Sequence, residues 1–181
     1  VNDNIKNSIS LVDNFFFYFN IDIVLELDDD IFLNNLANEF SQAFINILNN
    51  AKDKIVLNLK DNESGLIKIK TKKIDNFIEI LVLDNALGVD KDILNKIFEP
   101  YFTTKHKYQG TGLGLYMTRK IINSSMGGEI SVQNKKFTHN KKEYKGAEFK
   151  IKIPLKLDWL WLKVCDIILS YNLKFLIKWM I

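Results

Sequence analysis

Hydrophobic and polar positions repeat with different periods along the chain, and each period predicts a type of element. Between residues 21 and 27 apolar and polar residues alternate, which predicts a half-buried strand. Over residues 33–48 the apolar positions recur every three or four residues, which predicts a helix. A run of polar residues at 49–53 is expected to end that helix.

The middle of the chain has the pattern of paired strands followed by a turn-rich region. Strands are predicted over residues 66–70 and 77–83, with a turn at residues 75–76 between them. The second strand runs directly into the sequence Asp-Asn-Ala-Leu-Gly at residues 84–88. A short helix that ends at Phe98 is expected to follow, before a break at a proline.

The last part of the globular pattern begins with a polar stretch over residues 103–110. A helix is predicted over residues 112–125, and two glycines at 127–128 are expected to end it. Strands predicted at 129–134 and 147–153 flank a basic hairpin. Strand pairs with helices segregated between them predict an α+β two-layer sandwich, in which helices cover one face of a mixed, mostly antiparallel sheet.

The composition fits one globular domain with an appendage. Of the 181 residues, 47% are hydrophobic and 26% are charged, which excludes an intrinsically disordered chain. A net charge of +3 with both signs interspersed is too weak to predict nucleic-acid binding. A single cysteine, Cys165, excludes an intramolecular disulfide and fits a reducing, cytoplasmic compartment. The chain begins at Val1 without a signal-peptide pattern, so a fragment or an alternative start is expected.

Two asparagines are candidate ligands on the first predicted helix. Asn46 and Asn50 are four residues apart and therefore share a face, while Ile47 and Leu48 point toward the core. Asparagine is unfavourable inside a helix, and its amide oxygen is a neutral ligand that suits Mg²⁺ already bound to phosphate. Taken alone, a solvated face in an Asn-rich chain is the simpler explanation.

Two more candidates lie where a strand ends and where a helix begins. Asp84 follows an apolar strand, where a carboxylate needs a donor such as the adenine amine, and Gly88 would let the backbone approach a flat ring. The sequence Gly-Thr-Gly-Leu-Gly-Leu at 110–115 opens a helix whose first N–H groups attract phosphate. It matches neither the Walker nor the dinucleotide pattern. Each feature alone is an ordinary turn.

The order of these segments carries more information than any one of them. The asparagine helix, the Asp84 turn, the sequence Phe-Glu-Pro-Tyr-Phe-Thr-Thr-Lys at 98–105 and the glycine loop follow one another. Together they resemble the N, G1, F and G2 boxes of the catalytic domain of sensor histidine kinases, which shares an ATPase superfamily with gyrase, Hsp90 and MutL. The resemblance covers residues 5–155 and is most specific over 97–115. It predicts a domain over residues 1–155.

The resemblance implies roles for the matching residues. Asn50 would coordinate Mg²⁺ between the phosphates of ATP, and Asn46 lies where gyrase and Hsp90 relatives have a catalytic glutamate. Asp84 would accept from the adenine amine beside Gly88, and Lys105 would be a catalytic cation on the phosphates. The other implied cofactor-binding residues are Asp53, Thr104, Gly110, Thr111, Gly112, Leu113 and Gly114, most of them in a lid over residues 103–114.

The sequence departs from the family pattern within the implied adenine site. The G1 box is usually Asp-x-Gly-x-Gly, and Ala86 and Leu87 occupy its middle here. Leu87 is expected either to crowd the pocket or to alter the turn. Many relatives have Gly-Thr in the last strand, where this chain has Ala147. Both differences bear on nucleotide affinity rather than on the fold.

The acceptor of a histidine kinase is not recognisable in this sequence. The two histidines are His106, in the implied lid, and His139, in the basic hairpin, and neither matches an acceptor motif. We therefore expect the acceptor on a dimerisation domain in another chain or in a lost segment, with no autophosphorylation in cis. A response regulator would act downstream of the parent kinase, and the resemblance implies a parent that is typically anchored to a membrane.

Residues 156–181 lie outside the resemblance and are rich in Trp, Leu and Ile. Their polar residues recur every three or four positions, which predicts an amphipathic helix rather than a membrane span. The sequence leaves several uses open for this tail. It could lie on a membrane surface, dock on a partner or on the domain's own sheet, or be read-through from an altered gene.

Two other functions remain to be weighed against a kinase that uses Mg-ATP. A degenerate module would bind nucleotide weakly or not at all and act by association, which Leu87 and the missing acceptor favour. Asn50, Asp84 and the glycine loop oppose that alternative. A sister ATPase or an anti-sigma serine kinase is disfavoured by the sequence at 98–105 and by Asn46, where a base would be needed.

Overall fold

The computed structural model describes residues 1–28, 37–60, 63–105 and 110–155, and the predicted helix of the tail lies outside them. A five-stranded sheet has the order β1-β2-β3-β5-β4. Its strands are β1 (Ile21–Leu27), β2 (Gly65–Ile74), β3 (Phe77–Asp84), β4 (Glu129–His139) and β5 (Lys142–Pro154). The helices are α1 (Asn2–Ser10), α2 (Asp13–Tyr18), α3 (Ala37–Asn58), α4 (Gly114–Lys120) and the π-helix η1 (Ile121–Ser125).

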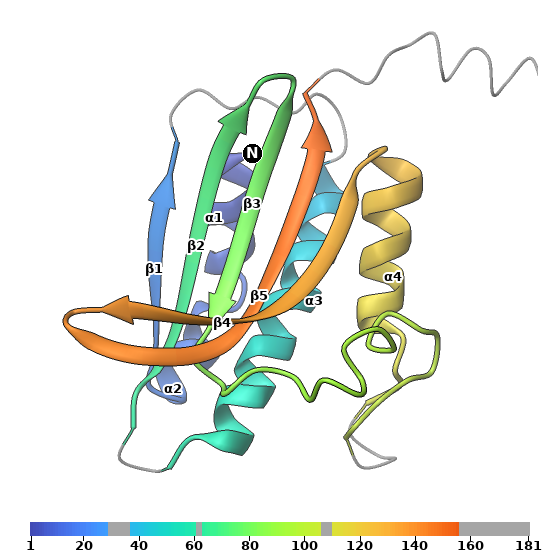
Figure 1. Ribbon diagram of the computed structural model, residues 1–181. Coiled ribbons are helices and arrows are strands. Elements are labelled where there is room, and N and C mark those ends of the chain that lie inside the picture. Colours follow the sequence, from blue (N-terminus) through green and yellow to red (C-terminus); the bar gives the residue numbers. More distant parts are fainter. Residues whose placement is uncertain (29–36, 61–62, 106–109, 156–181) are drawn as a thin grey trace, which may run out of the picture.

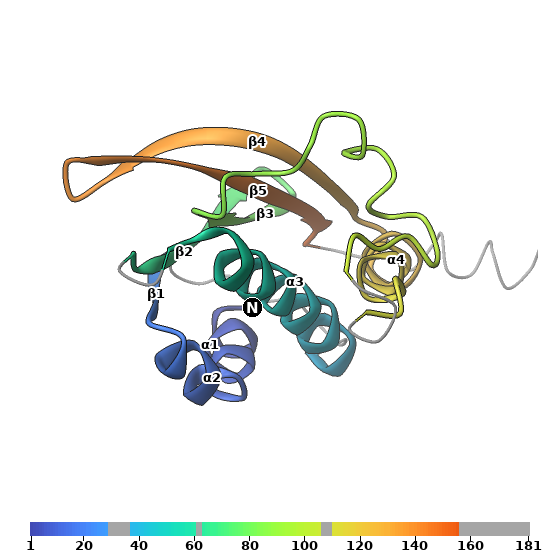
Figure 2. The same cartoon turned by 90° about the horizontal axis from the view of Figure 1, so that it is seen from below.

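The helices form one layer and the sheet forms the other, as Figures 1 and 2 show. β1 pairs with β2 in parallel, and the other three pairs of neighbouring strands are antiparallel. Helices α1, α3 and α4 cover one face, and the opposite face of the sheet carries no helix among the described residues (Figure 2). The predicted α+β sandwich with a mixed, mostly antiparallel sheet is therefore confirmed.

Helix α3 supplies much of the core because its apolar residues form a continuous stripe. The stripe consists of Phe40, Ala43, Phe44, Ile47, Leu48, Ala51 and Ile55, all of which are buried. The prediction that the helix ends within 49–53 is wrong, since α3 continues to Asn58. Its polar residues in that stretch lie beside the stripe rather than interrupting it, and Ile55 carries the buried face one turn further.

Three other expectations about local structure need correction. The N-terminal helices were not predicted, because α1 is rich in Asn and Ser and forms where Ile5 and Ser8 pack into the core. Residues 91–98 form successive turns instead of a short helix. Only Phe98 is buried among them, so no apolar stripe stabilises a regular helix. The helix predicted from residue 112 begins at Gly114 and widens into η1 before the glycines.

The last two strands extend well beyond their predicted ends. β5 pairs with β3 as far as Leu83 and Glu148, whereas β4 and β5 stay paired as far as His139 and Lys142. The predicted basic hairpin is thus a two-stranded continuation of the sheet, residues 135–146, which we call the arm. In Figure 1 the arm bends across the lower end of β1 and β2. Within the described residues, no helix is long and apolar enough to cross a lipid bilayer.

Two leucines of α3 test how far the core depends on this helix. Leu48 is fully buried and Leu57 is 70% exposed. We expect Leu48→Ala to lower the free energy of unfolding by about 2–5 kcal/mol, because it removes buried methyl groups and leaves a cavity. Leu57→Ala, the matched control on the same helix, should change it by less than about 0.5 kcal/mol. Urea unfolding measures both, and equal effects would contradict the described orientation of α3.

Candidate functional site

One cavity of about 930 Å³ lies between α3, the loop after β3, the segments on either side of residues 106–109, and β5. It brings together most of the residues singled out in the sequence. Those that line it are Asn46, Asn50, Asp84, Gly88, Thr104, Lys105, Gly110, Thr111, Gly112 and Gly114. Asp53 and Leu113, the other two predicted cofactor-binding residues, do not line it.

Asp84 lies at the buried end of β3 and is 4% exposed. Its Oδ1 accepts hydrogen bonds from the backbone N–H groups of Ala86, at 2.9 Å, and Ala147, at 3.1 Å. Among the described residues no hydrogen bond reaches its Oδ2. Burial raises the pKa of Asp84 to about 6, and the two backbone donors oppose that rise. The cavity therefore contains a carboxylate with one oxygen available for a ligand donor.

Glycines give this end of the cavity its shape. A Cβ on Gly146 would lie 1.6 Å from the carbonyl oxygen of Asp84, so β5 can pass the end of β3 only at a residue without a side chain. Gly88 has φ +87°, and a Cβ there would lie 2.4 Å from Oδ1 of Asn134. The predicted role of Gly88 in shaping the pocket is consistent with this close approach.

Leu87 is accommodated in the left-handed backbone region, with its side chain largely exposed. Its φ is +69°, in the left-handed region that non-glycine residues rarely adopt, and its side chain is 55% exposed. Its backbone N–H donates to the carbonyl oxygen of Lys145 at 3.0 Å, which holds the turn against β5. Leu87 also lines the cavity, so the turn keeps this side chain at the entrance.

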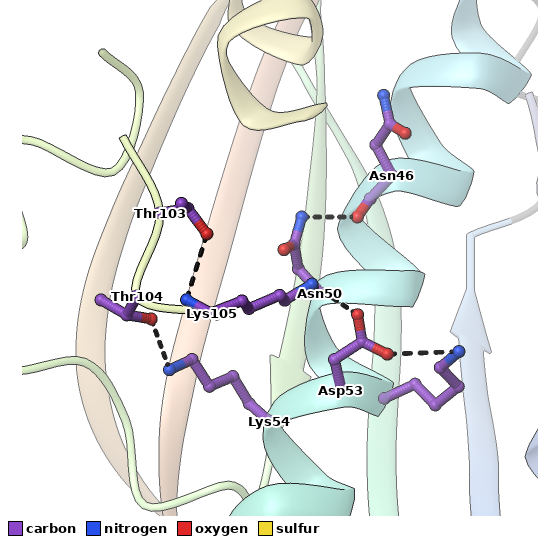
Figure 3. A network of polar contacts seen from close by, with 8 residues as sticks. Asn46, Asn50, Asp53, Lys54, Thr103, Thr104 and Lys105 are labelled. Carbon is purple, nitrogen blue, oxygen red and sulfur yellow. Dashed lines mark hydrogen bonds and ion pairs between the residues drawn. The ribbon is translucent and has the colours of Figure 1, made fainter. Parts of the chain in front are cut away.

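The two predicted asparagines of α3 are held in place by backbone groups. Asn50 donates from Nδ2 to the carbonyl oxygen of Asn46 at 2.8 Å, which leaves its Oδ1 available on the cavity side (Figure 3). Asn46 donates from Nδ2 to the carbonyl oxygen of Gly114 at 3.3 Å and so connects α3 to the start of α4. Asn50 is thus oriented as a neutral oxygen ligand.

Lys105 makes an ion pair that its predicted role did not anticipate. Its Nζ lies 2.5 Å from Oδ2 of Asp53, and Lys52 lies 3.2 Å from the other oxygen of the same carboxylate. One residue earlier, Thr104 accepts a hydrogen bond from Nζ of Lys54 at 3.0 Å (Figure 3). Both contacts fasten residues 104–105 to α3.

Sequence reasoning missed several polar residues of the site, among them Lys54 and Asn58. Both line the cavity, and Asn58 donates from Nδ2 to the carbonyl oxygen of Ala86 at 2.9 Å. With Asn46 and Asn50 they repeat every four residues, which is one polar stripe along α3. The repeat was present in the sequence, but the early predicted end of the helix concealed it.

Comparison with known proteins identifies the family to which this chain belongs. Residues 35–157 match the family described as histidine kinase-, DNA gyrase B- and HSP90-like ATPases. The chain belongs to this family. Among relatives, sporulation kinase A of Bacillus subtilis is 34% identical over 128 residues, which cover 71% of this chain and 18% of the relative. The histidine-protein kinase AtoS of Escherichia coli is 38% identical over 109 residues, 59% of this chain and 17% of the relative.

Solved structures agree with the sequence relatives. The catalytic domain of the histidine kinase ThkA superposes with a TM-score of 0.68 at 28% identity, covering 84% of this chain and 92% of that chain. ThkA in complex with the response regulator TrrA gives a TM-score of 0.65 at 26% identity, covering 86% of this chain and 40% of that chain. The predicted resemblance to the catalytic domain of sensor histidine kinases is confirmed. The chain spans less than a fifth of the length of its curated relatives.

The residues present fit a nucleotide better than a bare metal ion. Among the described residues no group of three or more His, Cys, Asp or Glu side chains could hold a metal. A cation near Asn50 would therefore need the phosphates of the nucleotide as its main ligands. The cavity is also within the size range of small-molecule and cofactor sites.

The buried carboxyl group of Asp84 predicts a distinctive pH dependence of stability. Its pKa is raised from 3.8 to about 6 on folding, so its contribution is fully present below about pH 4 and is lost as the pH rises through 6. Asp84→Asn cannot titrate. Between about pH 3 and 8 the wild-type chain should therefore lose about 3 kcal/mol of unfolding free energy relative to this variant.

Urea unfolding across this pH range measures the difference directly. Asp92→Asn, a control at an exposed aspartate, should change the free energy of unfolding by less than about 0.5 kcal/mol. A constant difference between Asp84→Asn and wild type would show that the pKa of Asp84 is not raised.

Proposed function

We propose that this chain binds Mg-ATP in the cavity and acts as the catalytic domain of a two-component sensor histidine kinase. It would transfer the γ-phosphoryl group to a histidine that lies outside this sequence. One observation carries the proposal: a single cavity contains the carboxylate of Asp84 and the polar stripe of α3, which runs from Asn58 beside the Asp84 loop to Asn46 at the glycine loop. Histidine kinases among the relatives and similar structures support it.

The Asp84 end would hold the adenine. The available Oδ2 would accept from the exocyclic amine, while Oδ1 stays bound to two backbone N–H groups and fixes the carboxylate in place. Gly88 and Ala147 line the same region without long side chains. A neutral acceptor would be weaker, so the ionised form of Asp84 is the one that binds.

The polar stripe and the glycine loop would hold the triphosphate. Asn50 would offer its oxygen to Mg²⁺, and Mg²⁺ and the phosphates together supply the electrophilic phosphoryl group. Lys54 follows Asn50 by one turn and makes no ion pair with a carboxylate among the described residues, so its charge is available to phosphate. Asn46 carries an amide, which cannot remove a proton from water, and this favours transfer to a protein acceptor over hydrolysis.

The protein partners that we propose are partners of the full-length parent kinase. The acceptor would be a histidine-bearing dimerisation domain in another chain or segment. A response regulator would take the phosphoryl group next, as a complex of ThkA with TrrA is known for that kinase. A cytoplasmic location suits both partners and the ATP supply, and anchoring of the parent to a membrane stays an expectation.

A second function, an association module that does not use nucleotide, is favoured by one feature. Lys105, the predicted phosphate contact, is paired with Asp53 and is therefore not free to bind phosphate. Nucleotide binding distinguishes the two functions, because only the kinase requires it.

Titration with ATP by calorimetry tests the proposal, with and without Mg²⁺. Saturable binding is expected for the wild-type chain. Asn50→Ala should remove most of the dependence on Mg²⁺, and Asp84→Asn should weaken binding about tenfold or more because it removes the charged acceptor. Asn123→Ala, an exposed control, should bind as the wild type does. If a folded wild-type chain binds no nucleotide, the association module is the better account.

A comparison of Lys54 and Lys105 tests which lysine serves the phosphates. We expect Lys54→Gln to weaken ATP binding about tenfold while leaving adenosine binding unchanged, since only the phosphates lose a charged donor. Lys105→Gln, which changes the charge equally, should have a smaller effect because Asp53 already neutralises Lys105. The opposite order of effects would assign the phosphate contact to Lys105.

A further inference from the structure

The arm, residues 135–146, extends beyond the nucleotide site, and among its residues only Lys145 lines the cavity. Beyond the pair Leu83 and Glu148, β5 has β4 as its only strand partner in the described residues. The two strands continue as a ribbon about 20 Å long. The ribbon bends over β1 and β2 on the side of the sheet away from the helices (Figures 1 and 2).

The outer part of the arm is ordered by its own contacts. The rings of Phe137 and Tyr144 stack across the two strands at 5.5 Å. The turn consists of Asn140 and Lys141, whose φ values of 47° and 65° are those of a tight two-residue hairpin. A cross-strand aromatic pair and a favourable turn stabilise a ribbon that has no third strand.

The base of the arm is fastened to the body of the domain. The side chain of Asn134 accepts from the backbone N–H of Val89 and donates to its carbonyl oxygen, both at 2.7 Å. The carbonyl oxygen of Lys145 accepts from the N–H of Leu87. These three bonds hold the ribbon in a defined direction, so its charges lie at fixed places relative to the domain.

The arm carries more positive charge than its surroundings neutralise. Residues 135–145 contain five lysines and one glutamate, while the net charge of the entire chain is only +3. On the open face of the sheet, by contrast, three lysines are paired with acids: Lys68 and Lys70 with Glu26, and Lys150 with Glu79.

Most lysines of the arm have no acidic partner. Lys135 pairs with Glu148. Lys136, Lys141, Lys142 and Lys145 make no ion pair within the described part of the chain, and Lys142 instead lies 5.2 Å from the ring of Tyr144. Lys136 is directly opposite Lys145 in the register, an arrangement in which like charges repel. An external anion would relieve this repulsion.

The distribution of these lysines indicates the kind of anion. Lys136 and Lys145 lie on one face of the ribbon, Lys142 lies on the other beside the stacked rings, and Lys141 is in the turn. A folded acidic protein would contact one face, whereas lipid headgroups can surround a ribbon on all sides. Lysine is a point charge suited to diffuse attraction, and aromatic rings are favoured at the membrane interface.

We propose that the arm is a docking surface for an anionic lipid bilayer, with the four unpaired lysines in the headgroup layer and the Phe137–Tyr144 pair at its boundary. Docking of the arm would hold the catalytic domain at the membrane surface. The proposal does not rest on the nucleotide site, because lipid binding can be measured without nucleotide.

The experiment is co-sedimentation of the full chain with vesicles of phosphatidylcholine alone or mixed with phosphatidylserine. Three proteins are compared: the wild-type chain, an arm variant and a charge-matched control. The arm variant combines K136Q, K141Q, K142Q and K145Q. The control combines K6Q, K60Q, K96Q and K120Q, which remove as many exposed lysines elsewhere. Unchanged thermal unfolding establishes that each variant folds.

The wild-type chain and the control should sediment with anionic vesicles, less so at high salt, and bind neutral vesicles weakly. The arm variant should bind anionic vesicles roughly tenfold more weakly or worse. Equal binding by the arm variant would overturn the proposal and assign binding to another part of the chain. Absence of wild-type binding would also overturn it, leaving an acidic protein partner or protection of a sheet edge as the use of these lysines.

Discussion

The carboxylate of Asp84 is the group on which both the sheet and the cavity depend. It lies where β3 ends, and a single oxygen accepts N–H groups from the following loop and from β5, so that three segments meet at one buried charge. Gly146 allows this meeting, because any side chain there would collide with the backbone of Asp84. Burial disfavours the charged form and raises the pKa of Asp84, these two donors offset only part of that effect, and the second oxygen is left for a ligand.

Helix α3 connects that buried group to the rest of the site by using two faces at once. Its apolar stripe packs on the sheet, and its polar stripe of Asn46, Asn50, Lys54 and Asn58 lines the cavity beside it. The packing that stabilises the domain therefore also sets the spacing of the polar side chains. Asn58 extends this connection. It donates a hydrogen bond to the carbonyl oxygen of Ala86, and the backbone N–H of the same residue donates to Asp84.

Over the rest of the described molecule, many charged side chains are neutralised by partners within the domain. The sheet surface without helices is rich in lysine and glutamate that pair with one another, which keeps an open sheet face compatible with water. The lid residues next to the cavity are fastened by Asp53 and Lys54. The arm differs from the sheet surface and from the lid residues, because its lysines outnumber the acidic residues around them. Charges that are neutralised within the domain stabilise it, whereas the unpaired lysines of the arm are available to a partner.

The sequence alone determined the fold class, the order of the strands along the chain and ten of the residues that line the cavity. It did so because alternation, helical spacing and turn glycines are local properties, and because four short segments occur in an order that a known family shares. The paths of α1 and α2, the length of α3 and the turns at 91–98 were decided by packing, since each depends on which residues find a buried neighbour.

The roles of the lysines were likewise decided only in three dimensions. Lys105 pairs with Asp53 and Lys54 turns toward Thr104, although their sequence positions favoured Lys105 as the phosphate contact. The sequence predicted a basic hairpin between these strands, but the length of the arm depends on where the distant strand β3 stops pairing with β5. An ion pair or a strand pairing joins residues far apart in the chain, so tertiary structure alone determines which charges are neutralised and which remain free.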